Sequence, residues 1–174
     1  MSPTRTAMSA ATLCIALSLA AATAPAIAAD GVALPKDYRT TFSNYLSLDR
    51  TQNPDQIIRL FANDKALEAV RAGKELPDGS VIVGEIYKAE VDKDGKPVIS
   101  KLGRKIRDKL ALIAVMEKRA RFGKELPAEL QNDGWDFAAY KPDGKEAGKD
   151  LNTCRACHAP LKDTQHLFSL EHIK

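Results

Sequence analysis

The sequence predicts an α+β domain, made of a largely antiparallel β-sheet with a few short helices and a C-terminal cofactor-binding helix. Three observations support this fold class. Residues 80–91 alternate in the two-residue rhythm of a strand and run into a polar turn at 92–97. Short apolar runs at 40–48 and 57–62 are bounded by polar segments. Helical spacing occurs only briefly, and we therefore expect no helical bundle.

The first half of the chain predicts two strands and one helix. Residues 40–48 contain Thr, Phe, Tyr and Leu, which favour a strand, and the polar segment 49–55 predicts a loop. A second apolar run at 57–62 predicts the next strand. Asn63 can then cap a helix, which we expect to end at Gly73.

Residues 77–91 predict a turn followed by the clearest strand. Proline presets φ and glycine supplies a positive φ in Pro77-Asp78-Gly79. The strand places alternate residues on opposite faces, and Glu85 is the polar exception on an otherwise apolar face shared by Val81, Val83, Tyr87, Ala89 and Val91. After the turn at 92–97, residues 98–99 are expected to begin a short return strand.

The second half is more ambiguous at one place. Residues 106–116 include seven consecutive apolar residues, which a buried strand or a buried helix would explain equally well; the preceding hairpin turn favours a central strand. Residues 121–133 predict a loop or short helix. Residues 134–140 predict the last strand, in which Trp135 is expected to pack in the core, and 150–159 predict a short helix.

The N-terminus predicts a secretory signal peptide over residues 1–28, followed by one domain over 29–174. Arg5 is its only charge, an apolar stretch covers 10–24, and Ala26-Ile27-Ala28 offers small residues for cleavage. The formal net charge is +3, of which Arg5 contributes one, so the exported chain carries about +2. This weak charge argues against nucleic-acid binding, and no later stretch is apolar enough to span a membrane.

The pentapeptide Cys154-Arg155-Ala156-Cys157-His158 predicts covalent attachment of one haem c. Two thiols three positions apart can form thioethers with the two haem vinyl groups. The following histidine can bind the iron, while its other ring nitrogen donates to a carbonyl or carboxylate. Attachment of this kind fits an exported, periplasmic protein whose remaining cysteines both belong to the motif.

Three other interpretations of the motif are weaker. A redox pair requires a thioredoxin-like context, which does not precede Cys154. A zinc site could recruit His166 and His172, but no second cysteine pair exists. A disulfide between Cys154 and Cys157 would close too small a loop to stabilise the fold much.

The whole mature chain resembles the cytochrome P460 and cytochrome c′-β family. The order and spacing of several short motifs carry the resemblance: Pro35-x-x-Tyr38-Arg39, Gly73, Pro77-Asp78-Gly79, Val81-x-Val83-x-Glu85, Gly134-Trp135-x-Phe137, Cys154-x-x-Cys157-His158, Lys162-Asp163-Thr164 and Phe168-Ser169. The resemblance implies a β-rich domain, often a homodimer, with a five-coordinate haem iron bound by His158.

The resemblance also implies two activities within the family. Cytochromes P460 oxidise hydroxylamine and carry a lysine cross-linked to the porphyrin, whereas c′-β members bind nitric oxide and similar small ligands. Gly84 occupies the cross-link position here, and Lys88 is about 13 Å further along the strand. The resemblance therefore favours a protein that binds small nitrogen-oxide or gaseous ligands, with hydroxylamine or nitric oxide oxidoreduction as an alternative.

The sequence offers several candidates for the side of the haem opposite His158. Phe42, Phe61 and Met116 are candidates for an apolar haem pocket, although ordinary core packing is the favoured interpretation of each of them. Met116 could instead bind the iron, which would indicate an electron-transfer cytochrome with a six-coordinate haem. His166 and His172 are alternative ligands that we expect at the surface. The redox partner is not predicted.

Overall fold

The computed structural model describes residue 1 and residues 31–51 and 53–174. The predicted signal peptide at 1–28, apart from its first residue, lies outside the described residues. Five antiparallel strands pair in sequence order, and three short helices complete the domain, so the predicted α+β class is confirmed. The strands are β1 (Ser43–Asp49), β2 (Gln56–Ala62), β3 (Val81–Ala89), β4 (Arg107–Lys118) and β5 (Trp135–Tyr140). The helices are α1 (Tyr38–Thr41), α2 (Asp64–Arg71) and α3 (Leu151–His158).

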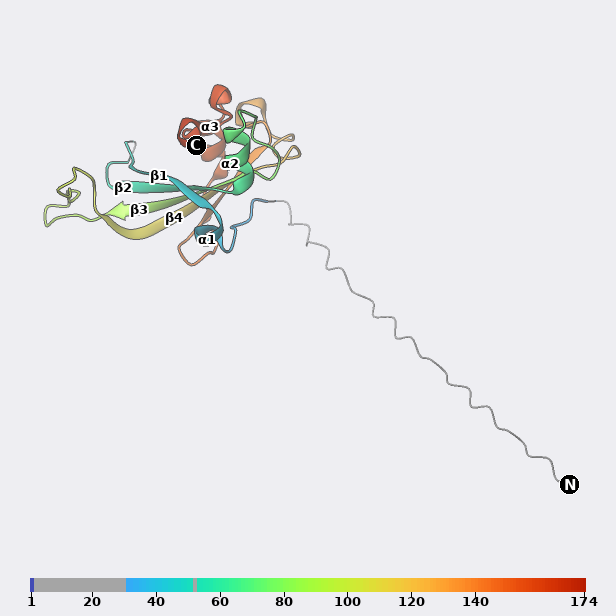
Figure 1. The fold of residues 1–174 in the computed structure, drawn as a ribbon. Helices are drawn as coiled ribbons and strands as arrows, with labels where there is room; N and C mark the ends of the chain where they lie inside the picture. Colours follow the sequence, from blue (N-terminus) through green and yellow to red (C-terminus); the bar gives the residue numbers. More distant parts are fainter. Residues whose placement is uncertain (2–30, 52) are drawn as a thin grey trace.

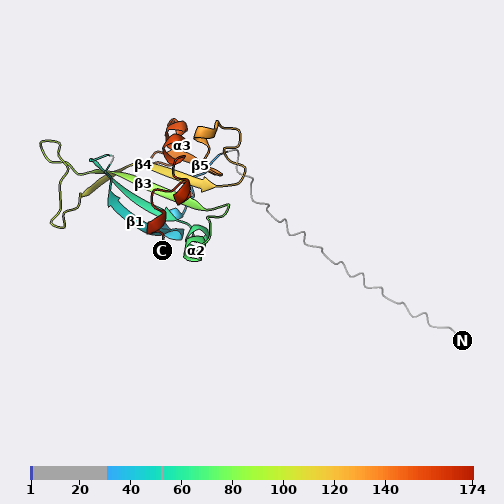
Figure 2. The same cartoon turned by 90° about the horizontal axis from the view of Figure 1, so that it is seen from above.

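The helices divide the sheet into two faces. Helices α2 and α3 and the C-terminal segment cover one face, here called the inner face, and α1 lies against the other, the outer face (Figure 1). In the view from above, α3 lies beside β5, and α2 lies toward the other edge (Figure 2). Each face has its own buried cluster, so the sheet is the middle layer of the domain.

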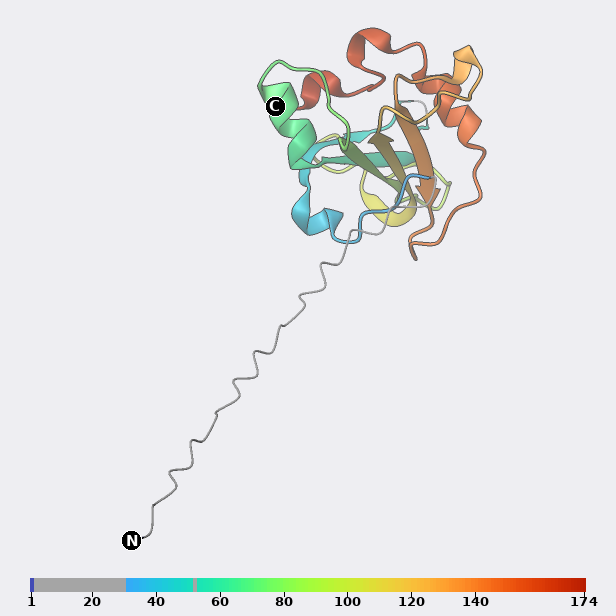
Figure 3. The same cartoon turned by 90° about the vertical axis from the view of Figure 1, so that its right-hand side faces the viewer.

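The inner cluster joins the sheet to both helices and to the tail. Ile82, Met116 and Phe137 lie side by side in register on β3, β4 and β5. Leu67 of α2 and Leu167 of the tail pack on them. Figure 3 shows the segment after α3 running above the sheet toward α2, where Arg71 Nε donates a hydrogen bond to the carbonyl of Lys174.

The strand predicted at 40–48 begins three residues later than expected. Thr40 and Thr41 instead belong to α1, because their backbone N–H groups and their hydroxyls all donate to the carbonyl of Asp37. Threonine can satisfy a nearby carbonyl in this way, and this local bonding wins over its preference for strands. The strand starts once the chain has left this turn, at Ser43.

The strand predicted at 106–116 is confirmed as β4, which pairs with β3 along most of its length and with β5 over Ile113–Lys118, so the helical alternative is wrong. The return strand predicted at 98–99 is also wrong. Ile99 makes only an isolated bridge to Lys105, because a second turn at 100–104 follows the first at 92–96. The two turns form an arm over residues 90–106 that projects from the end of the sheet (Figure 1).

The two eight-residue helices, α2 and α3, both begin at polar caps, of which the sequence predicts the first, Asn63. The side chain of Asn63 accepts a hydrogen bond from the N–H of Ala66 at the start of α2. The side chain of Asp150 accepts one from the N–H of Asn152 at the start of α3. These bonds satisfy helix N–H groups that would otherwise lack partners.

Glu85 interrupts the apolar alternation of β3 because it is the centre of a buried charge network on the outer face. Its carboxylate is fully buried and accepts hydrogen bonds from Tyr38, Arg39, Arg59 and Tyr87. Burial by itself would raise the pKa of this carboxyl, but the hydrogen bonds outweigh it and lower the pKa. Glu85 is therefore ionised and ties α1 to β2 and β3.

We predict that Glu85→Gln lowers the free energy of unfolding by about 3 kcal/mol at neutral pH, because two arginines lose a buried counter-charge. A carboxyl with a lowered folded-state pKa stabilises the fold above its unfolded pKa, and this contribution is lost as the pH falls through the folded pKa. The difference between variant and wild type should therefore vanish in acid. Urea unfolding of both proteins, at neutral pH and at a pH below the folded-state pKa of Glu85, measures this difference.

The matched control is Asp55→Asn, which breaks the half-exposed ion pair with Lys88. Solvent screens that pair, so its loss should lower stability much less than the loss of the Glu85 charge. Equal losses in the two variants would contradict the special role given to Glu85.

Candidate functional site

The three chemically important residues of the pentapeptide lie on α3. Cys154 is one helical turn before Cys157 and His158, so the spacing brings all three to the same side of the helix. Both cysteines are free thiols; Cys154 is half-buried against the inner cluster and Cys157 is exposed. Burial raises the pKa of the Cys154 thiol.

The ring of His158 is held in one orientation. Its Nδ1 lies 2.7 Å from the carbonyl oxygen of His166, which can only accept, so Nδ1 carries the proton. The ring also packs between Phe137 and Phe168, with centroid distances of 4.9 Å and 5.0 Å. Burial lowers the pKa of His158 and so favours the neutral imidazole, whose Nε2 is the atom left to bind a metal.

His166 is not a surface residue, contrary to the expectation from sequence. It is 1% exposed, and both of its ring nitrogens are engaged. Nδ1 lies 3.1 Å from the carbonyl oxygen of His158, and Nε2 lies 2.9 Å from the Asp133 carboxylate. The hydrogen bond from His166 lowers the pKa of Asp133. His166 is thus committed within the protein, whereas His172 is exposed as expected.

Beyond the inner cluster, the inner face of the sheet is apolar and only half-buried. Paired positions of β1 to β5 supply its side chains: Leu46, Leu48, Ile58, Leu60, Ile86, Leu112, Ala114 and Ala139. We call this surface the open inner face. Contiguous exposed apolar surface of this kind marks a place where a protein binds something. The alternation of Ile82, Gly84 and Ile86 was the sequence signal for it.

Gly84 lies in the middle of the open inner face. A Cβ at this position would lie 3.3 Å from Leu60 Cδ2, which is a tight contact. Lys88 lies on the same face by alternation, at its polar margin, and its ammonium lies 2.8 Å from the Asp55 carboxylate. Neither residue therefore places a free amine over the apolar surface.

The sheet separates the three residues considered for a haem pocket. Met116 belongs to the inner cluster, on the same face as Phe137, which contacts His158. Phe61 belongs to the outer cluster, and Phe42 packs against that cluster. The two phenylalanines therefore lie on the other side of the sheet from α3, and the three side chains do not line one pocket.

Trp135 packs in the inner cluster, as predicted, and is almost fully buried. Its indole N–H has no hydrogen-bond partner among the described residues. The preceding Gly134 has a φ of 87°, and a Cβ there would lie 2.9 Å from the Arg119 carbonyl oxygen. The Gly-Trp pair thus depends on glycine to let β5 enter the sheet close to the end of β4.

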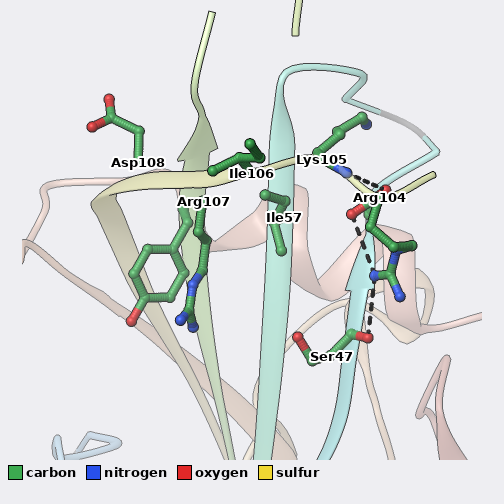
Figure 4. A pocket seen from close by; sticks show the side chains of 9 residues that line it. Ser47, Ile57, Arg104, Lys105, Ile106, Arg107 and Asp108 are labelled. Atoms are coloured by element: carbon green, nitrogen blue, oxygen red, sulfur yellow. Dashed lines mark hydrogen bonds and ion pairs between the residues drawn. The ribbon is translucent and has the colours of Figure 1, made fainter. Parts of the chain in front are cut away.

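A cavity of about 580 Å³ opens on the outer face, beneath the base of the arm (Figure 4). Its walls include Ile57, Tyr87 and three cations, of which Arg104 is paired with Asp49 at 3.3 Å and Arg107 lies over the Tyr87 ring at 4.8 Å. It contains none of the pentapeptide residues. The chemistry of α3 therefore concerns the inner face.

Arg155, between the two cysteines, is a positioning residue that the sequence analysis missed. Its guanidinium donates two hydrogen bonds to Asp136 Oδ1, at 3.0 Å and 2.7 Å, and both side chains are mostly buried. The side chain of Asn132 donates to the carbonyl of Arg155. These contacts attach α3 to β5 from both its side chain and its backbone.

The residues present fit a covalently bound haem. Two free thiols and a neutral imidazole, whose Nε2 has no hydrogen-bond partner among the described residues, share one side of α3 next to the inner face of the sheet. A family model described as Cytochrome P460 matches residues 35–169. No curated protein matches the chain.

We predict that Arg155→Met loosens α3 without unfolding the sheet. Loss of the hydrogen bonds to Asp136 should lower the local stability of α3 by about 2 kcal/mol, as expected for charge-assisted bonds in a half-buried place. Hydrogen exchange of the α3 amides measures this. The control Lys149→Met removes an exposed cation just before the helix, and equal exchange in both variants would contradict the prediction.

Proposed function

This chain belongs to the cytochrome P460 family, and we propose that it is a periplasmic c-type haem protein that binds small neutral ligands such as nitric oxide. Family membership implies a haem protein in nitrogen-oxide chemistry. The choice of ligand binding over the other activities rests on the open inner face, which is apolar and adjoins Phe137, the β5 residue that packs against the His158 ring.

In this proposal Cys154 and Cys157 hold one haem c through thioethers, and Nε2 of His158 binds its iron. The haem supplies the iron atom at which a small ligand binds. His158 suits this role because its Nδ1 is already committed to a carbonyl, which fixes the tautomer and increases the basicity of Nε2. Phe137 and Phe168 restrict the rotation of the ring.

The polarity of the neighbouring surface supports a neutral ligand. The side chains of the open inner face are leucine, isoleucine and alanine, and the charged Lys88 lies only at its margin, paired with Asp55. An apolar environment penalises charged ligands such as nitrite, because their hydration is lost without compensation. Neutral diatomic molecules pay no such cost.

Hydroxylamine oxidation through a cross-linked haem receives less support. Gly84 has no side chain to form the cross-link that the family resemblance associates with that activity. Lys88, whose amine lies at the margin of this face, is paired with Asp55. We therefore propose ligand binding, with binding or detoxification of nitrogen oxides as its use.

Electron transfer is the second candidate, and the position of Met116 favours it. Met116 lies on the inner face beside Phe137, on the same side of the sheet as His158. A thioether ligand would give a six-coordinate, low-spin haem that does not bind carbon monoxide. Against this, Met116 is already buried between Ile82 and Phe137 in the core.

Location and domain limits are part of the proposal. We propose that residues 1–28 direct export and are removed, and that residues 29–174 form the haem domain, in agreement with covalent haem attachment outside the cytoplasm. None of the helices in the described part of the chain is long and apolar enough to cross a membrane. We also propose that the protein forms a homodimer, as the family resemblance implies.

We predict that the exported wild-type protein has the mass of residues 29–174 plus one haem. The double variant Cys154→Ser, Cys157→Ser should lack the covalent haem, because a serine hydroxyl does not add to a haem vinyl group as a cysteine thiol does. Mass spectrometry of protein purified after export, with a haem stain of the denatured chain, measures both. A wild-type mass without porphyrin would refute the proposed function.

We predict that Met116→Leu leaves the optical spectrum of the haem protein unchanged. Leucine has a similar volume and should cost under about 1.5 kcal/mol in the core. Wild type and variant should both show five-coordinate, high-spin ferric haem, and both should bind carbon monoxide when reduced. A low-spin wild type that becomes high-spin in the variant would establish the electron-transfer alternative instead.

A further inference from the structure

We propose that His166 and Asp133 form a positioning pair that sets the hydrogen bond, and thereby the donor strength, of the iron ligand His158. This inference rests on the proposed haem site and adds two residues to it that touch neither the thiols nor Nε2 of His158.

The two histidines hold each other by a pair of reciprocal hydrogen bonds. Nδ1 of His158 donates to the carbonyl of His166 at 2.7 Å, and Nδ1 of His166 donates to the carbonyl of His158 at 3.1 Å. The residues are eight positions apart, so the two bonds close the segment 158–166, which follows α3, into a loop. Any movement of the His166 backbone therefore changes the bond that His158 donates.

Asp133 connects this closed loop to the sheet. It lies two residues before β5, and its carboxylate accepts from Nε2 of His166 at 2.9 Å. His166 thus bridges a carbonyl and a carboxylate, which both accept. A histidine ring that donates to both acceptors carries a proton on each nitrogen, and its flat, rigid shape sets the two donors at opposite ends.

The backbone supports the same role. Gln165 and His166 have φ values of 51° and 62°, in the left-handed region that residues other than glycine seldom adopt. This conformation turns the carbonyl of His166 back toward α3. Two further bonds hold it: the N–H of His166 donates to the Leu161 carbonyl, and the Gln165 side chain accepts from the N–H of Leu76. Strained backbone maintained in this manner is typical of functional sites.

The consequence for the haem is electronic as well as steric. A hydrogen bond from Nδ1 to an oxygen makes Nε2 a stronger donor to iron. A core residue whose only task was packing would not influence that bond strength. The stretching frequency of the iron–histidine bond in the ferrous protein, measured by resonance Raman spectroscopy, therefore separates positioning from packing.

The experiment compares four variants of the haem protein with wild type. His166→Asn suits the positive φ but cannot reach both acceptors, and Asp133→Gly suits its φ of 46° and removes the carboxylate. Both should lower the iron–histidine frequency and speed exchange of the His158 Nδ1 proton. Asp133→Asn restores an acceptor and should recover most of the wild-type frequency. His172→Asn, at an exposed histidine, should change nothing.

Unchanged frequency and proton exchange in a haem-loaded His166→Asn protein would overturn the inference while leaving the proposed function intact. Should that variant fail to fold, Asp133→Gly decides alone, since the Asp133 side chain is largely exposed, and an unchanged frequency there would equally overturn it. A wild-type protein without haem would overturn both proposals. Equal shifts in His172→Asn would also contradict the role of the pair.

Discussion

The hydrogen bond from His158 Nδ1 to the carbonyl of His166 is the contact on which the candidate site depends. It selects the tautomer, leaves Nε2 for a metal and ties α3 to the tail that crosses the inner face. The neighbouring contacts serve the same end, because Arg155 holds α3 to β5 and His166 is held by Asp133. These contacts fix the orientation of α3, which local hydrogen bonds within the helix would not determine.

The sheet assigns different physical tasks to its two faces. On the outer face, Glu85 gathers two arginines and two tyrosines into a buried network that joins α1 to the strands. On the inner face, the adjacent Gly84 lies within an apolar surface that is only half-covered. Consecutive residues of β3 can serve such opposite purposes because successive side chains of a strand point to opposite faces.

Much of the fold was predictable, since strand alternation and helix caps are local signals. Glu85 marks where such reasoning was incomplete: it broke the pattern of β3, and its four partners come from segments far from it or two residues along the strand. The arm at 90–106 shows another limit, because one turn signal did not reveal that a second turn at 100–104 would replace the return strand expected at 98–99. The prediction about burial failed for His166, whose partner Asp133 is 33 positions away in the sequence.

The sequence by itself determined the cofactor chemistry to expect, because two thiols and an imidazole at this spacing suit haem attachment wherever the helix lies. It also determined the fold class through alternation. Only the tertiary structure decided that Met116 shares a face with His158 whereas Phe42 and Phe61 do not, and that His166 is a buried partner of His158. The reason is physical: which face a side chain shares with α3 depends on strand register and on the path of the tail, which are long-range properties.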